Sequence, residues 1–230
     1  MTVELVKHSA ADTDVLWAAR VSTAGEQSLE ELTRDPERSK GLINYLMRDR
    51  HGSPFEHNSM TFFISAPLFV FREFHRHRVG WSYNEESGRY RELEPVFYVP
   101  DADRALVQRG RPGKYDFVAG TEEQQRVVHE AMTDSYRRAY AAYQEMLAAG
   151  VAREVARATL PVGLYSSMYA TCNARSLMHF LGLRTRHELA RVPSFPQREI
   201  EMVGEGMEAE WKRLMPLTHA AFNAGGRVAP

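Results

Sequence analysis

The segment from Arg76 to Tyr90 reads RHRVGWSYNEESGRY and is the most distinctive part of this sequence. It brings together three arginines, one histidine, two glutamates, two serines and one asparagine. Arginine binds phosphate and carboxylate oxygens through paired N–H groups, and serine and asparagine add neutral hydrogen bonds. Arg72, His75 and Arg76 are spaced three and four residues apart, which predicts one shared face if they lie on a helix. Composition alone favours an anion site and a solvated cationic surface about equally.

The composition indicates a globular protein of one large domain or two small ones. The chain has 230 residues, of which 43% are hydrophobic and 26% charged. A net charge of −1 argues against broad nucleic-acid binding but leaves room for a local cationic site. Cys172 is the single cysteine, so we expect no disulfide framework and a reducing compartment. With neither a signal-peptide pattern nor a long apolar run, the sequence predicts a cytoplasmic protein without a membrane segment.

Local patterns predict few strands and several long helices. Asp35-Pro36 and Thr121 to Gln124 (TEEQ) are helix-start signals, and Asn173 is a third candidate N-cap. The predicted strands are 3–6, 60–65 and 164–171, with a short extended segment at 95–100. The predicted helices are 14–21, 35–48, 68–78, 121–149, 153–160, 173–184 and 197–214. Segments 102–120 and 191–196 are expected to be mobile loops. Since no linker or repeat divides the chain, we expect one α+β domain over residues 1–230.

Motif searches exclude several kinds of site. No HExxH pattern is present, and His51 and His57 are separated by glycine and proline, so no metal site is predicted. Cys172 lies in an apolar strand and has no recognisable catalytic partner. There is no GxSxG elbow, no P-loop and no GxGxxG after a strand. An anion would therefore be held by arginines and helix ends, and the candidates near turns are Arg76, Arg78, Arg89, Arg157, Arg175, Arg184 and Arg186. These residues predict a phosphorylated, aromatic ligand.

Several ordered segments resemble the flavin-dependent thymidylate synthases, a class that does not use a catalytic cysteine. The family pattern RHRxxSxNExSxRY corresponds here to Arg76-His77-Arg78 followed by Ser87 and Arg89. Further matching segments are VST (21–23), GSPFEH (52–57), REVARATLP (153–161) and NARSLMHFLGLR (173–184). The similarity therefore spans nearly the whole chain.

The resemblance implies an enzyme that methylates C5 of dUMP to give dTMP. Methylenetetrahydrofolate would be the carbon donor, and FAD reduced by NADPH would be the hydride source. It also implies a homotetramer with active sites between subunits, and a single-domain fold with a central, mostly antiparallel sheet and long helices. Neither nucleic acid nor membrane is an expected partner.

The resemblance also assigns residues to the two ligands. FAD contacts are implied for Ser22, His51, Ser53, Glu56, Arg76, His77, Arg78, Asn84, Glu85 and Asn173. Nucleotide contacts are implied for Glu73, Arg76, Glu85, Ser87, Gly88, Arg89, Arg157 and Arg184.

Among these residues, Arg184 is the expected catalytic group. A positioned guanidinium stabilises the negative charge that develops on a uracil carbonyl oxygen when C5 acts as nucleophile. Ser87 and Arg89 would hold the phosphate, and Arg157 would anchor the base or phosphate side. Cys172 matches no catalytic position of the family.

Two departures from the family pattern leave the nucleotide preference open. Eight residues separate Arg78 from Ser87, one more than usual, and we place the extra residue within VGW (79–81). Glu73 and His75 stand where other members carry glutamine and an apolar residue. The segment after Arg184, which includes His187, aligns poorly. Alternatives are a UMP/dUMP C5-methylase of nucleoside-antibiotic biosynthesis, a non-catalytic flavin-binding or nucleotide-binding protein, and an RNA-binding module.

Overall fold

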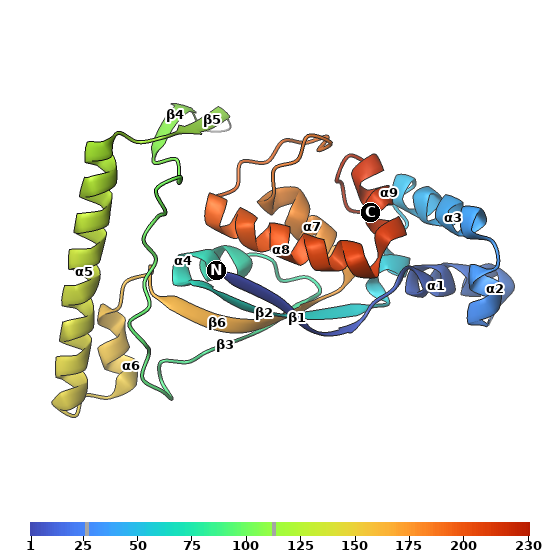
Figure 1. Cartoon of the computed structure of the whole chain (residues 1–230). Helices are drawn as coiled ribbons and strands as arrows, with labels where there is room; N and C mark the ends of the chain where they lie inside the picture. Colours follow the sequence, from blue (N-terminus) through green and yellow to red (C-terminus); the bar gives the residue numbers. More distant parts are fainter. Residues whose placement is uncertain (26–27, 112–113) are drawn as a thin grey trace. The chain divides into compact units, whose positions relative to one another are not determined.

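The computed structural model describes residues 1–25, 28–111 and 114–230 (Figure 1). Strands β1 (Thr2–Ser9), β2 (Ser59–Pro67), β6 (Tyr165–Cys172) and β3 (Trp81–Glu85) form one sheet in the order β1-β2-β6-β3. Strands β4 (Val107–Arg111) and β5 (Lys114–Val118) pair antiparallel as a separate sheet. The helices are α1 (Asp12–Ala24), α2 (Leu29–Thr33), α3 (Pro36–Arg48), α4 (Leu68–Phe74), α5 (Glu122–Ala148), α6 (Arg153–Ala156), α7 (Ala174–Arg184), α8 (Arg198–Leu214) and α9 (Pro216–Ala224). Short 3₁₀ turns occur at η1 (Ser53–Glu56) and η2 (Arg157–Thr159).

The predicted fold class, α+β with an antiparallel sheet, is confirmed. The chain clusters into two compact units, each assembled from separated segments. The first contains Met1–Ile64, Glu73–Asn84 and Met168–Pro230, and the second contains Ser65–Arg72 and Glu85–Ser167. Strands β2 and β6 continue from one unit into the other, so neither unit is a contiguous piece of chain. The assignment of 1–230 to one domain stays a prediction.

The first unit is built on one apolar face of the sheet. Alternate residues of β2 are buried, including Met60, Phe62 and Ile64, while those between them are partly accessible. This period of two is the pattern of a strand with one face in the core. Helix α8 packs against β1 and α7 (Figure 1), and its Trp211 is completely buried. The face of the sheet thus fixes where α7, and Arg184 at its end, are placed.

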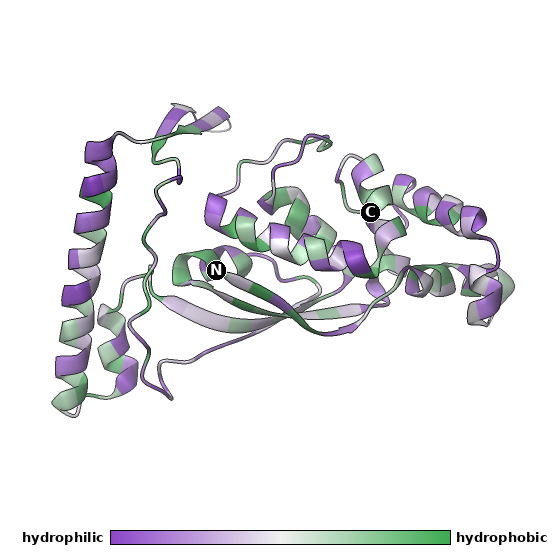
Figure 2. Cartoon of the chain, in the orientation of Figure 1, coloured by the Kyte–Doolittle hydropathy of each residue, from purple (hydrophilic) through white to green (hydrophobic). Residues whose placement is uncertain are grey.

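The second unit is organised by α5, which packs against α6 and η2. In Figure 2 the ribbon of α5 carries hydrophilic segments along much of its length, with apolar turns between them. On its inner side, Tyr136 stacks on Phe97 with ring centroids 4.8 Å apart, and the Tyr140 hydroxyl donates to the carbonyl of Leu93 at 3.2 Å. These contacts hold the chain that follows the signature segment.

All three predicted N-caps are confirmed. The side chain of Asp35 accepts a hydrogen bond from the backbone N–H of Arg38, and Asn173 accepts one from Ser176. Thr121 and Gln124 form the reciprocal capping box at the start of α5. Each cap satisfies N–H groups that the first helical turn leaves without a backbone acceptor.

Two expectations about local structure were wrong, and some elements were not predicted. Helix α4 ends at Phe74, so the shared helical face expected for Arg72, His75 and Arg76 does not form. The middle of the signature segment forms strand β3, which pairs with β6 and was not predicted. The segment 102–120 contains the β4–β5 pair and is not a simple loop. Helices α2 and α9 were not predicted, because α2 is very short and α9 follows α8 after a single residue, Met215.

Candidate active site

The catalytic candidate Arg184 lies at the last position of α7 and is held by two side chains of the same unit. Its Nε donates to Nε2 of His77 at 3.1 Å. Its Nη1 donates to Oε2 of Glu73 at 2.5 Å, and both members of this ion pair are mostly buried, with 18% and 22% of their side chains exposed. A charge-assisted hydrogen bond in such a place fixes the plane and direction of the guanidinium.

Burial and charge shift the pKa values of both partners. Burial, followed by the charge of Arg184, lowers the pKa of His77 to about 4. The imidazole is therefore neutral at pH 7 and accepts the hydrogen bond from Arg184 at Nε2, which leaves the proton on Nδ1. Burial also raises the pKa of Glu73, while the ion pair with Arg184 opposes that shift.

The turn that carries His77 is braced from two sides. The Tyr83 hydroxyl lies 3.1 Å from the carbonyl of Phe74, the last residue of α4, and 2.9 Å from that of His77, so it holds the chain that leaves the helix. Phe180 of α7 stacks on Phe74 at 4.7 Å and meets the His77 ring edge-on at 5.0 Å. His77 is thus positioned by strand β3 and helix α7 together.

A glycine completes this turn. Gly80 has a φ of +70°, and a Cβ there would lie 2.1 Å from Oγ of Ser176. Oγ of Ser176 in turn donates to the carbonyl of Val79 at 3.0 Å. The position therefore accepts only glycine without rearrangement, because a side chain would meet both backbone strain and a collision.

Three of the residues expected to contact FAD line one cavity in the first unit. Ser22, His51 and Ser53 surround a space of about 700 Å³ formed by α1, α3 and the start of η1. His51 stacks on Tyr45 of α3, with ring centroids 5.5 Å apart. A volume in the range of roughly 300–1,000 Å³ is typical of small-molecule and cofactor sites.

Several residues that line this cavity were not predicted from the sequence. They include Tyr45 and the arginines at positions 20, 34 and 38. Arg34 and Arg38 are four residues apart on either side of the Asp35 N-cap, and that spacing across a helix start was a usable signal for an anion site. The guanidinium groups of Arg34 and Arg38 can bind phosphate oxygens, which the serine and histidine side chains of this cavity bind less strongly.

Other residues expected to contact FAD lie outside the lining of this cavity. Glu56 forms an ion pair with Arg175 at 2.5 Å, and Arg175 also donates to the carbonyl of Pro230. Asn173 is occupied as the N-cap of α7. His77 contacts Arg184, as described above. The side chains of Arg76, Arg78 and Asn84 are exposed, and Glu85 is exposed in the second unit.

The residues expected to contact the nucleotide are divided between the two units. Glu73, Arg76 and Arg184 belong to the first, and Glu85, Ser87, Gly88, Arg89 and Arg157 belong to the second. Within the second unit, a Cβ on Gly88 would lie 2.8 Å from Leu93 and 3.3 Å from Cδ of Arg157. The turn that begins at Ser87 is therefore packed directly on Arg157.

The turn itself has the polar groups of an anion site. Oγ of Ser87 accepts from the backbone N–H of Arg89 at 3.3 Å, and the Ser87 carbonyl accepts from the N–H of Tyr90 at 3.0 Å. The Arg89 guanidinium pairs with Glu154 at 3.0 Å, and both side chains are about half exposed. Exposed pairs of this kind contribute only about 0–1 kcal/mol, so a phosphate group can replace the carboxylate.

Three further observations concern the cysteine, metal sites and membrane segments. Cys172 is buried, and burial raises the pKa of its thiol well above the usual range, so no reactive thiolate forms there. In the residues that the structure describes, no three histidine, cysteine, aspartate or glutamate side chains gather as a metal site would need. None of the helices in the described ranges has both the length and the apolar character to cross a membrane.

The first unit contains a mostly buried, positioned arginine and, separately, a cofactor-sized cavity, and comparison with known proteins identifies the class. The family described as "Thymidylate synthase complementing protein" matches residues 4–217. The chain is 85% identical over 230 residues to a flavin-dependent thymidylate synthase of Streptomyces avermitilis, covering all of this chain and 94% of that protein. It is 58% identical over 231 residues to the protein of the same name from Tropheryma whipplei, covering all of this chain and 95% of the relative. The chain belongs to the thymidylate synthase complementing protein family.

Solved structures show the same fold. A UMP/dUMP methylase, PolB of Streptomyces cacaoi bound with 5-Br UMP, superposes with a TM-score of 0.91 at 56% identity, covering all of this chain and 96% of that one. The structure of PolB with 5-Br dUMP gives a TM-score of 0.92 at 56% identity, with 100% and 97% covered. The family expected from the sequence is thereby confirmed.

Proposed function

We propose that this chain is an enzyme that methylates C5 of dUMP to give dTMP, with methylenetetrahydrofolate as carbon donor and NADPH-reduced FAD as reductant. The observation that carries the proposal is Arg184, fixed by Glu73 and His77 at the end of α7. Its relatives named flavin-dependent thymidylate synthase give independent support through high identity over the full length of the chain.

Arg184 is suited to stabilise negative charge on the uracil ring. A guanidinium has five N–H groups, and the contacts to His77 and Glu73 use one at Nε and one at Nη1. No hydrogen bond from the Nη2 group reaches any residue in the described part of the chain. The remaining N–H groups are therefore held in a fixed direction for a uracil carbonyl oxygen, whose charge grows as C5 attacks.

The cavity of about 700 Å³ fits a dinucleotide cofactor. Arginines at its wall would bind the pyrophosphate, Ser22 and Ser53 would add neutral hydrogen bonds, and the stacked pair of Tyr45 and His51 offers an aromatic surface. When bound, FAD supplies the reducing equivalents that convert the transferred one-carbon unit to a methyl group. The chain itself provides binding and orientation.

The turn at Ser87 would bind the nucleotide phosphate. The Ser87 hydroxyl and the Arg89 guanidinium are close in the chain, and Arg157 packs against Gly88 between them. Phosphate would replace Glu154 as the partner of Arg89. Since Arg184 and this turn belong to different compact units, we assign each set to the nucleotide without placing the two relative to one another.

A UMP/dUMP methylase is the second candidate. It is favoured by Glu73, because a charged carboxylate oxygen accepts a hydrogen bond from a ribose hydroxyl more strongly than the neutral carbonyl oxygen of a glutamine would. The similarity to PolB at 56% identity supports it as well. The 85% identity to a protein named for thymidylate synthesis favours dUMP.

One experiment separates these functions. The purified protein is examined for a flavin spectrum, reduced with NADPH, and incubated with methylenetetrahydrofolate and either dUMP or UMP. We expect dTMP from dUMP and no methylated product from UMP. Equal turnover of UMP would favour the methylase. A protein whose flavin is reduced but which methylates neither nucleotide would contradict both and favour a non-catalytic binding protein.

We also propose a cytoplasmic homotetramer with active sites between subunits. Support comes from large apolar side chains that the single chain leaves exposed, including Trp17, Tyr169 and Leu183, which are 48%, 52% and 63% exposed. Light scattering coupled to size-exclusion chromatography measures the mass of the assembly. A mass of one 26.3 kDa chain at working concentration would contradict the tetramer.

A further inference from the structure

A second cavity in the first unit contains none of the residues expected to contact the flavin or the nucleotide. It has a volume of about 480 Å³ and lies at the C-terminal end of α3, which packs against α9 (Figure 1). Its walls come from α3, from the end of α9 and from the segment after α7. The cationic residues that line it are Arg48, Arg50 and Arg191.

This cavity has an excess of positive charge. Arg48 is neutralised by Asp49 through two contacts of 2.7 and 3.0 Å. Arg50 and Arg191 have no carboxylate within 4.0 Å among residues 1–25, 28–111 and 114–230. The charge of Arg50 also contributes, after burial and Arg175, to lowering the pKa of His179 on α7. Two unneutralised guanidinium groups facing one space favour a doubly charged anion.

The backbone holds Arg50 in an unusual conformation. Its φ is +61°, in the left-handed region that costs a non-glycine residue of the order of 1–3 kcal/mol. The N–H of His51 donates to the carbonyl of Leu46 at 2.9 Å, which closes the end of α3 around this residue. Glycine at position 50 would end the helix with less backbone strain. The presence of arginine there therefore points to a role for its side chain.

Arg191 is anchored by the C-terminal segment. Its backbone N–H donates to the carbonyl of Gly226 at 2.9 Å, and a Cβ on Gly226, whose φ is +72°, would lie 2.8 Å from Cβ of Arg191. The segment that aligned poorly with the family, after Arg184, is thus attached where its arginine faces this cavity. A mobile loop, as expected for 191–196, would not need such an attachment.

The other residues that line this cavity are suited to contact the ring of a ligand, in addition to its charged groups. Met47, Ala221 and Ala224 provide apolar surface, Asn44 provides an amide and Tyr45 provides an aromatic ring. We propose that this cavity binds a nucleoside phosphate at a site distinct from the proposed flavin and substrate sites, with Arg50 and Arg191 holding the phosphate groups.

Tyr45 lines both this cavity and the larger one that contains Ser22, His51 and Ser53. A ligand bound in the smaller cavity therefore contacts the same side chain whose ring stacks on His51. The flavin absorption spectrum should change when the smaller cavity is filled, provided that the flavin binds as proposed. The proposed binding of a nucleoside phosphate in the smaller cavity does not depend on this change in the flavin spectrum.

The test uses the full protein saturated with FAD and dUMP, so that the proposed cofactor and substrate sites are already occupied. Calorimetry measures the affinity for ADP, pyrophosphate, citrate and adenosine. Comparing ADP with citrate tests whether phosphate is preferred to carboxylate. Comparing ADP with pyrophosphate and with adenosine separates the contribution of the charge from that of the ring. We expect ADP to bind more tightly than pyrophosphate, with citrate and adenosine at least about tenfold weaker than ADP, which corresponds to about 1.4 kcal/mol. Citrate binding as tightly as ADP would overturn the assignment to phosphate.

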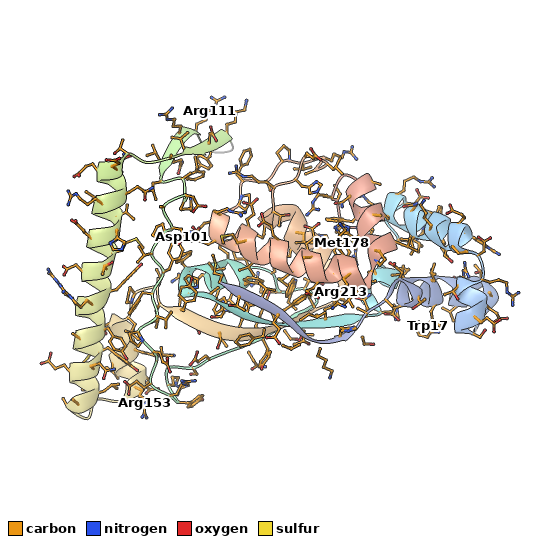
Figure 3. All side chains as sticks on the ribbon, in the orientation of Figure 1. Trp17, Asp101, Arg111, Arg153, Met178 and Arg213 are labelled. Atoms are coloured by element: carbon orange, nitrogen blue, oxygen red, sulfur yellow. The ribbon has the colours of Figure 1, made fainter. Side chains whose placement is uncertain are left out.

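The variants Arg50→Asn and Arg191→Gln should each weaken ADP binding about tenfold, since each removes one charge-assisted contact. Asparagine tolerates the left-handed backbone of position 50, so folding should be preserved. Arg213→Gln on α8, labelled in Figure 3, is the matched control because its exposed arginine pairs with Glu210 away from the cavity. Unchanged ADP affinity in the folded double variant, or equal loss in Arg213→Gln, would overturn the proposal.

Discussion

Nε of Arg184 lies 3.1 Å from Nε2 of His77, and the imidazole is the acceptor in this pair. A protonated histidine has no free lone pair on either ring nitrogen, so the contact requires neutral His77. Burial and the adjacent guanidinium both lower the pKa of His77 and keep it neutral at physiological pH. The orientation of Arg184, the proposed catalytic group, therefore depends on the protonation state of His77.

Arg184→Ala should lower the turnover number with dUMP by about 100- to 1,000-fold, the usual cost of removing one oxyanion-stabilising donor. Flavin content should stay close to that of the unmodified protein, because Arg184 does not line the cavity that contains Ser22 and Ser53. Single-turnover product formation and the visible spectrum are measured together. Arg186→Ala, an exposed arginine two residues further on, is the control, and parallel loss of flavin and turnover would contradict the assigned role.

Acid should destabilise the protein through His77. Its pKa falls from 6.5 in the unfolded chain to about 4 in the folded one, so the unfolded state binds more protons between these values. Stability should therefore decrease as pH falls from 6.5 towards 4. Urea denaturation at several pH values measures this dependence, and His77→Gln should flatten it because glutamine keeps an acceptor and does not titrate.

Glu73 acts in the opposite sense and needs to be separated from His77. Its raised pKa means that the folded state holds the carboxyl proton more tightly, so its contribution is lost as pH rises through that pKa. Because Glu73 is present in both proteins, the difference between the two pH profiles isolates His77. If the pH dependence of the free energy of unfolding were the same in His77→Gln and the unmodified protein, burial would not lower the pKa of His77 as described.

Ser87→Ala should raise the KM for dUMP severalfold and leave kcat nearly unchanged, since loss of a phosphate contact weakens substrate and transition state equally. Steady-state kinetics with dUMP varied at saturating folate give both constants. Ser82→Ala is a suitable comparison, because Ser82 is an exposed serine of the same signature segment on β3. A fall in kcat at constant KM would assign Ser87 to the chemical step.

Cys172→Ala should retain activity, because a buried thiol with a raised pKa supplies no nucleophile. Removing its sulfur from a packed strand should lower the free energy of unfolding by about 1 kcal/mol. Activity and urea midpoint are compared with those of the unmodified protein. A folded variant without turnover would contradict the cysteine-independent mechanism.

Gly80→Ala should lower the free energy of unfolding by about 1–3 kcal/mol, since alanine would be strained at φ +70° and would meet Ser176. Gly41→Ala is the opposite case: it lies within α3 and a Cβ there meets nothing within 4 Å. That change should stabilise the protein by up to about 1 kcal/mol. Equal effects of the two substitutions on urea denaturation would contradict the structure of the turn.

The sequence was most informative where a local rule decides the structure. Helix starts at Asp35, Thr121 and Asn173 follow from side chains that satisfy their own first turn, and each was predicted correctly. Family membership followed from motif order, since RHR and the segment ending at Arg184 are specific. Helix caps and family motifs are formed by residues close together in the sequence, so they can be recognised from one sequence alone.

Long-range pairing could not be predicted. Strand β3 (WSYNE) mixes aromatic with polar residues, and its pairing with β6, about 85 residues away in the chain, has no local signal. The carbonyl of Phe74, where α4 ends, is contacted by the hydroxyl of Tyr83 from nine residues further along the chain. The pairing of Arg184 with Glu73 joins residues 111 apart, so no local pattern could indicate it.

The Tyr83 hydroxyl contacts the carbonyls of Phe74 and His77, and the turn from Arg78 to Trp81 connects His77 to Tyr83. Val79 in this turn is 90% exposed. The side chain at position 79 can therefore be varied while the imidazole that holds Arg184 stays fixed, whereas Gly80 and Trp81 are fixed by their contacts. For protein engineering, Val79 is the position of this turn at which side chains of different size or charge can be introduced to alter substrate preference without rebuilding the support of Arg184.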